Sequence, residues 1–208
     1  MSSPPSDGYV ERFSFRERVV HWAVAISFVY VTATGLSLWS HKLLWLSTIF
    51  GGGEATRWGH PWGGVAFAVI LGVMFVSWAR QMRVDDDDRR WLRRAHRYAS
   101  NDTAGMPESG RFHGGQKMLF WAQTLAALAL LGSGLVMWFA GTAPRGLAFA
   151  ALLIHPIAAV VAIGGIILHV YMAVAAIPGS LRAMTRGSVS AHWAAAHHAK
   201  WYAKISGR

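Results

Sequence analysis

Four apolar stretches, each long enough to cross a bilayer, constrain this chain more than any other feature. A hydrocarbon core of about 30 Å needs roughly 20 helical residues. The stretches cover about Val19–Leu38, Pro61–Ala79, Met118–Trp138 and Leu147–Ile177. Only 14% of the 208 residues are charged, whereas a soluble domain usually carries about 25%. The sequence therefore predicts an all-α integral membrane protein, a four-helix bundle forming a single membrane domain over residues 1–208.

The fourth stretch is longer than one span requires and contains Pro156. Proline removes a helical hydrogen bond and bends or breaks a helix. We therefore expect a helical approach, a kink near His155, and then the span itself.

Basic residues fall almost entirely on one side of these four stretches. Cytoplasmic loops of membrane proteins are enriched in Lys and Arg, so the uneven distribution orients the chain. Both termini are predicted to be cytoplasmic, as segments 1–18 and 178–208, and the N-terminus is expected to be retained because no basic start leads directly into an apolar core. Seventeen of the 20 basic residues share the predicted cytoplasmic side, and the other three are Lys42, Arg57 and Arg145.

The net charge of +10 would suit a polyanion-binding protein, but its placement along one membrane face argues for lipid contact and against nucleic acid. The acidic run at residues 85–88 also falls on the cytoplasmic side. We interpret it as a solvated loop that pairs with neighbouring arginines. Among the ten histidines, those in the predicted loops and tail, apart from His113, are also expected to be solvated.

Four histidines lie in or at the predicted spans: His21, His60, His155 and His169. Ionisable residues at membrane depth are costly and mark functional sites. His155 and His169 are separated by about 21 Å of helical rise and an angular offset of roughly 40°, so both face one side of the fourth span at two levels. With the predicted topology, His60 lies at the same depth in the membrane as His155, and His21 lies at the same depth as His169.

Two matched pairs of imidazoles are the arrangement that two stacked b-type haems require, since imidazole is a common haem ligand. We predict an outer pair, His60 and His155, and an inner pair, His21 and His169, as axial ligands of the haem irons. Both outer ligands precede proline. Proline suits a first helical turn and holds the preceding residue out of the α region, so it could fix the approach of each ring to the iron. An ordinary helix start explains these two prolines equally well.

The chain contains no cysteine. This excludes disulfides, thiolate zinc sites, cysteine-ligated iron-sulfur clusters and covalently attached c-type haem. Electrons for a haem protein of this composition must then come from a partner.

Several segments together resemble one family. They are RFSFRERVVHW around His21, GHPWGGVAF around His60, GGQKMLFW, LLIHPIAAV with IILHVYMAV, and the tail GSVSAHWAAAHHAKWY. In order and spacing they resemble the cytochrome b (gamma) subunits of membrane-bound respiratory formate dehydrogenases, within the wider group that includes the cytochrome b of nickel-iron hydrogenases. The resemblance extends from about Val10 to Lys204.

This resemblance implies a multi-pass protein of the bacterial inner membrane that acts as the electron-transfer and quinone-reducing subunit of a formate:quinone oxidoreductase. It implies partners: an iron-sulfur (beta) subunit and a molybdenum or tungsten catalytic (alpha) subunit, with a possible higher oligomer of the complex. Electrons would pass through outer and then inner haem b to menaquinone or ubiquinone near the cytoplasmic face. No residue of this chain would itself oxidise formate.

The resemblance also implies a quinone site beside His169, formed by His113, Gly115 and Gln116. An amide and backbone N–H groups can donate to a quinone carbonyl, and glycine permits close approach. The family has an Asn-like amide where this chain has His113. An imidazole there could instead relay protons.

Three alternatives remain open from the sequence. The chain could be the cytochrome b of a hydrogenase or of a thiosulfate-type oxidoreductase, with similar haems and another partner. It could instead be a transporter whose histidines bind a divalent metal, or a haem-free anchor.

Overall fold

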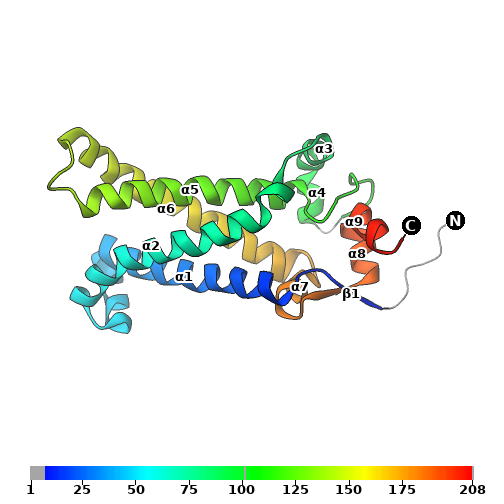
Figure 1. The fold of residues 1–208 in the computed structure, drawn as a ribbon, viewed down its shortest axis with the longest axis horizontal. Helices are drawn as coiled ribbons and strands as arrows, with labels where there is room; N and C mark the ends of the chain where they lie inside the picture. The colour runs from blue at the N-terminus through cyan, green and yellow to red at the C-terminus, as the bar shows by residue number, and fades with distance from the viewer. Residues whose placement is uncertain (1–7, 101, 208) are drawn as a thin grey trace. The chain divides into compact units, whose positions relative to one another are not determined.

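Four long helices dominate the computed structural model, which describes residues 8–100 and 102–207 (Figure 1). Each has the length and hydropathy of a membrane span. They are α1 (Phe15–Trp39), α2 (Gly53–Trp78), α5 (Gly114–Trp138) and α6 (Arg145–Tyr171). The all-α fold with four membrane helices is thereby confirmed. The predicted cytoplasmic segments include residues 1–7 and 208, which lie outside the described residues.

The two His-Pro pairs lie inside helices and not at helix starts. Helix α2 begins at Gly53, well before Pro61, and α6 continues through Pro156. The interpretation of Pro61 and Pro156 as parts of first helical turns was therefore wrong. The expected kink near His155 stays a prediction. In lipid every backbone polar group needs an internal partner, so a continuous helix is favoured even where proline removes one bond.

The described chain divides into two compact units. The first unit contains the residues up to 19, 77–121 and those from 166 onward, and the second contains residues 20–76 and 122–165. Each long helix has residues in both units.

The second unit is built from parts of the four long helices and from the 3-10 helix η1 (His41–Phe50), which joins α1 to α2. Its buried positions are mainly small or hydroxyl-bearing, as at Thr34, Thr56 and Ala162. Small residues let helix backbones approach closely, as is common in membrane bundles. Its outer positions are large and apolar; Ile26, for example, is 70% exposed, which suits contact with lipid.

The first unit has its own folded elements, although the sequence predicted only a loop and a tail there. The central segment forms η2 (Ala79–Met82), α3 (Asp86–Arg93) and α4 (Ala95–Ala99). The C-terminal segment continues α6 as a π-helical turn, η3 (Met172–Ala176), and forms α7 (Ser180–Thr185), α8 (Ala191–His197) and α9 (Ala199–Ile205).

A short antiparallel sheet joins the two ends of the chain in this first unit. Strand β1 (Tyr9–Glu11) pairs with β2 (Ser188–Ser190), with Val10 opposite Val189. Nearby, the buried rings of Trp91 and Tyr98 pack with Ile177 into a hydrophobic core. The sequence alone did not reveal this core.

Candidate functional site

The outer pair of histidines comes together in the second unit. His60 lies on α2 and His155 on α6, and their ring centroids are 6.2 Å apart with an interplanar angle of 77°. Both rings are half-buried. The two histidines paired by their predicted depth are therefore neighbours on different helices.

Each of these rings is held by a hydroxyl group from another helix. The Nδ1 atom of His60 lies 3.0 Å from Thr34 Oγ1 on α1, and the Nδ1 atom of His155 lies 3.0 Å from Ser133 Oγ on α5. Neither hydroxyl residue was predicted from the sequence, because each acquires its role from a histidine on another helix. Both stand directly before a glycine, in Thr34-Gly35 and in Ser133-Gly134.

This arrangement fits a haem iron. Two imidazoles that hold one iron, with metal-nitrogen bonds of about 2 Å and about 1 Å from each nitrogen to its ring centre, would have centroids about 6 Å apart, close to the observed separation. The hydroxyl groups engage Nδ1, so Nε2 of each ring is the atom available for iron. Metal-binding histidines characteristically use their second nitrogen in such an outer hydrogen bond.

A metal-ion transport site finds no such support. Within residues 8–100 and 102–207, no three His, Asp or Glu side chains gather as ligands for a metal ion. A pair of imidazoles is fewer than the four ligands that a structural zinc site usually has, whereas two imidazoles would suffice to hold a haem.

The inner pair is divided between the two units. His21 belongs to the second unit and His169 to the first, and both are half-buried. His21 packs edge-on against Trp22 of its own helix, with ring centroids 5.6 Å apart. Their joint ligation of an inner haem stays a prediction.

Two of the predicted quinone-binding residues form the start of α5. The backbone N–H of His113 donates to Gln116 Oε1 at 3.1 Å, and the backbone N–H of Gln116 donates to His113 Nδ1 at 3.4 Å. The Gln116 side chain thus satisfies the His113 amide, which a helix start leaves without a helical partner. The backbone N–H of Gln116 also donates to the His113 carbonyl oxygen at 3.0 Å. The NH₂ group of Gln116 takes no part in these bonds.

The glycines at this helix start have a packing role. A Cβ atom on Gly115 would lie 2.8 Å from the Trp91 ring, and one on Gly114 would lie 2.7 Å from the Asp88 carbonyl oxygen. The absence of side chains here lets α3 approach α5. Helix packing alone therefore explains why glycine occupies position 115, and quinone contact by Gly115 stays a prediction.

His113 lies in an aromatic stack. Its ring is parallel to Trp91, with centroids 4.2 Å apart, and faces His198 at 5.7 Å. Burial, and then the positive charge of Arg12, lowers the pKa of His113 to about 3. The ring is therefore neutral at physiological pH, which argues against the proton relay considered from the sequence.

Arg12 and His198 are buried and connect segments of the first unit that are far apart in the sequence. His198 is fully buried, so its interpretation as a solvated tail residue was wrong. Its Nδ1 atom lies 2.7 Å from the Gly110 carbonyl oxygen and therefore donates, leaving Nε2 to accept from Arg12 at 2.8 Å. Arg12 also donates to the Arg111 carbonyl oxygen at 2.9 Å. Burial lowers the pKa of Arg12 to about 9.

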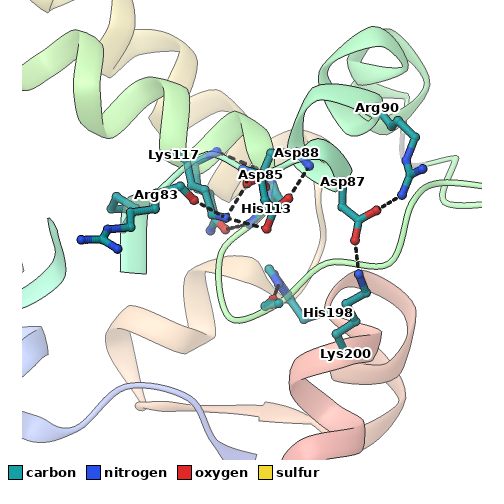
Figure 2. A network of polar contacts seen from close by, with 12 residues as sticks. Arg83, Asp85, Asp87, Asp88, Arg90, His113, Lys117, His198 and Lys200 are labelled. Carbon is teal, nitrogen blue, oxygen red and sulfur yellow. Dashed lines mark hydrogen bonds and ion pairs between the residues drawn. The ribbon is translucent and has the colours of Figure 1, made fainter. Parts of the chain in front are cut away.

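A buried ion pair lies directly beside the start of α5 (Figure 2). Lys117 Nζ lies 2.5 Å from Asp88 Oδ2 and donates to the Arg83 carbonyl oxygen at 3.0 Å. The side chains of Lys117 and Asp88 are only 9% and 6% exposed. The acidic run is thus not simply a solvated loop: Asp88 is buried and Asp85 caps α3.

Comparison with known proteins identifies the family of this chain. The family model of prokaryotic cytochrome b561 matches residues 12–187. The cytochrome b556(Fdn) subunit of the nitrate-inducible formate dehydrogenase of Escherichia coli strain K12 is 34% identical over 94% of this chain and 91% of its own length. The cytochrome b556(fdo) subunit of formate dehydrogenase from the same organism is 32% identical over 94% of this chain and 93% of its own length.

A third relative, the cytochrome b556 subunit of formate dehydrogenase from Haemophilus influenzae, is 29% identical over 95% of this chain and 84% of its own length. The match to the family covers most of the sequence, including the stretches that carry all four membrane helices. The chain therefore belongs to the prokaryotic cytochrome b561 family, as a multi-pass cytochrome b of the bacterial inner membrane.

Proposed function

We propose that this chain is the di-haem cytochrome b (gamma) subunit of a membrane-bound formate dehydrogenase. The observation that carries the proposal is the outer pair, in which His60 and His155 stand 6.2 Å apart with their Nδ1 atoms engaged. The similarity to formate dehydrogenase subunits over nearly the whole chain favours this complex over a hydrogenase or a thiosulfate-type oxidoreductase.

His60 and His155 would hold the outer haem b, and His21 and His169 the inner haem b. When bound, haem b supplies one-electron redox chemistry, and two haems in series would connect a periplasmic electron donor with quinone near the cytoplasmic face. The four histidines would hold these haems between the apolar helices. The apolar side chains of the helices would exclude water around them.

The chain's composition requires partners for the rest of the reaction. Without cysteine it has no thiolate ligands for iron-sulfur clusters. We therefore assign the clusters to an iron-sulfur subunit, and formate oxidation to a molybdenum- or tungsten-containing subunit. This chain anchors the complex in the membrane.

The proposed orientation places both termini in the cytoplasm, following the distribution of Lys and Arg. The outer pair then lies toward the periplasm and the inner pair toward the cytoplasm. Electrons would move inward, and protons for quinol would be taken up from the cytoplasm.

The quinone site is proposed at the start of α5, beside His169. The NH₂ group of Gln116, which lies outside the capping pair, can donate to a quinone carbonyl. Gly115 and His113 border the same helix start. His113, with its pKa lowered to about 3, acts there as a neutral ring.

The assignment is tested on the complex purified from membranes. Difference spectra of dithionite-reduced and oxidised samples should show two b-type haems per chain, and formate should reduce them in the intact complex. His60→Ala should remove one haem, and His155→Ala the same one. His41→Ala, an exposed histidine on η1, is the matched control and should retain both.

Absence of haem from the wild-type chain would overturn the cytochrome assignment. Haems that dithionite reduces but formate does not, in a complex with its partners present, would overturn the assignment to formate dehydrogenase. If His60→Ala kept both haems, the outer pair would be wrong.

A further inference from the structure

The two hydroxyl groups beside the outer histidines are oriented by their own helices. Thr34 Oγ1 lies 2.7 Å from the Tyr30 carbonyl oxygen, and Ser133 Oγ lies 2.6 Å from the Ala129 carbonyl oxygen. A carbonyl oxygen only accepts, so each hydroxyl donates its hydrogen to the preceding helical turn. Each oxygen is then left as an acceptor toward the neighbouring imidazole.

This direction of donation determines which ring nitrogen carries hydrogen. Nδ1 of His60 and Nδ1 of His155 must each donate to the hydroxyl oxygen, at 3.0 Å in both cases. A neutral imidazole with hydrogen on Nδ1 has its lone pair on Nε2. The two hydroxyl groups thus select the tautomer that ligates a metal through Nε2.

A glycine beside each hydroxyl residue sets the position of the ring. A Cβ atom on Gly35 would lie 3.0 Å from Cε1 of His60, and one on Gly134 would lie 3.2 Å from Cε1 of His155. A side chain at either glycine would push the imidazole away. The hydrogen bond to the hydroxyl group therefore sets how each imidazole ring is rotated, and the glycine leaves the space in which the ring lies.

The same arrangement occurs twice in the chain. Residues 21–39 and 120–138 align without a gap, with identical residues at Trp22 and Trp121, Ala23 and Ala122, Gly35 and Gly134, Leu36 and Leu135, and Trp39 and Trp138. Thr34 and Ser133 occupy equivalent places in this alignment. Two helices that present hydroxyl and glycine in the same way to two separate histidines argue against a packing accident.

We propose that Thr34 and Ser133 are positioning residues for haem ligation by His60 and His155. The inference rests on the proposed haem-binding function and extends it to the residues that prepare the ligands. Neither residue touches the iron. Each keeps Nδ1 protonated, orients Nε2, and increases the basicity of the ligand through its accepted hydrogen bond.

The test compares Thr34→Val and Ser133→Ala with the wild type in the purified complex. Valine has nearly the shape of threonine but no hydroxyl group, so the change removes the acceptor with little change in volume. Loss of such an outer partner typically weakens metal binding about 10–100-fold. We expect the outer haem to be lost more readily, and its midpoint potential to become more positive because a less basic ligand stabilises the oxidised iron less.

Two controls separate this role from general packing. Thr34→Ser retains the acceptor and should behave as the wild type. Ser37→Ala removes another buried hydroxyl of α1, one that donates to the Thr34 carbonyl oxygen at 2.8 Å, and should leave the outer haem unchanged. The outer haem signal is normalised to the inner haem signal of the same purified complex, so a variant that accumulates poorly is still measured.

The proposal is overturned if Thr34→Val and Ser133→Ala leave the content, spectrum and potential of the outer haem unchanged while the wild type holds two haems. It is also overturned if Thr34→Ser or Ser37→Ala changes the outer haem as much as Thr34→Val does. A wild-type chain without haem would instead refute the proposed function, so the two failures are distinguishable.

Discussion

Lys117 and Asp88 are two charged residues buried together at the start of α5. A buried ion pair often contributes little net stability, but removing one partner leaves an uncompensated charge in a poorly solvated place. The loss of stability caused by a single substitution therefore measures how deeply the pair is buried, and not how much the intact pair contributes to the free energy of unfolding.

Lys117→Met should lower the free energy of unfolding by roughly 3–5 kcal/mol, measured by thermal unfolding of the detergent-solubilised protein. The double variant Lys117→Met with Asp88→Asn should recover much of this loss, because asparagine keeps an acceptor without a charge. Arg89→Ala is the control: Arg89 pairs with Asp86 at the surface, where the side chains are 68% and 86% exposed, and should cost at most about 1 kcal/mol. Equal effects of Lys117→Met and Arg89→Ala would contradict the burial of the pair.

Three histidines of the first unit are held in the neutral form. Burial, followed by the charge of Arg12, lowers the pKa of His113 to about 3, of His197 to about 4, and that of His198 well below its usual range. In the unfolded chain these groups bind protons below about pH 6.5, whereas the folded unit does not. Stability is therefore fully present above that pH and is lost as the pH falls toward the folded pKa values.

Unfolding temperatures at pH 7.5, 6.5 and 5.5 should decrease in that order. Replacing one buried histidine, as in His113→Phe, should reduce the slope by up to about 1.4 kcal/mol per pH unit below pH 6.5. His96→Phe, at an exposed position, should leave the slope unchanged. Stability independent of pH over this range would show that these rings are not neutral in the folded state.

At the scale of elements, the short helix α3 shows how a charged run acquires structure. Asp85 accepts a hydrogen bond from the Asp88 backbone N–H, and Asp88 accepts one from the Asp85 backbone N–H, both at 2.9 Å. This capping box begins the helix, and Trp91 on the same helix enters the core of the first unit. Hydrogen bonding at the cap thus places an aromatic ring against His113.

Asp85→Ala should cost about 1 kcal/mol through loss of the cap and should speed hydrogen exchange of the α3 amides. Asp85→Asn should retain most of the protection, because asparagine is an equally good N-cap residue. If Asp85→Asn were as damaging as Asp85→Ala, the charge near Lys117, and not the cap, would be the main contribution of Asp85.

At the scale of the whole molecule, the proposed orientation can be tested because the chain contains no cysteine. Single cysteines at Thr142, in the turn between α5 and α6, and at Ser206, after α9, are exposed positions on opposite predicted sides. A membrane-impermeant maleimide should label Thr142→Cys in intact spheroplasts and Ser206→Cys only after the membrane is opened. The reverse pattern would invert the topology and exchange the proposed outer and inner sites.

The elements that could be predicted are those whose formation depends on short-range patterns. Apolar length identified the four long helices. The predicted topology paired His60 with His155, and their rings lie 6.2 Å apart. Helix ends were less predictable: α2 begins at Gly53 and not at Pro61, because continuous backbone hydrogen bonding in lipid outweighs the local preference of proline.

The folded structure of the first unit was not predicted, because it depends on contacts between residues far apart in the sequence. Arg12 and His198 are 2.8 Å apart although 186 positions separate them, and no local pattern marks either as buried. Thr34 and Ser133 were missed for the same reason, since each acquires its role from a histidine on another helix.

By itself, the sequence determined the membrane class, the number of long helices, the positions of the membrane histidines along them and the exclusion of thiolate chemistry, because length, composition and helical periodicity act locally. Only the tertiary structure decided which hydroxyl groups hold the outer histidines, which charges are buried, and that the central segment and tail fold together. Those outcomes depend on desolvation and hydrogen bonding between segments far apart in the chain, which exist only once the segments have packed.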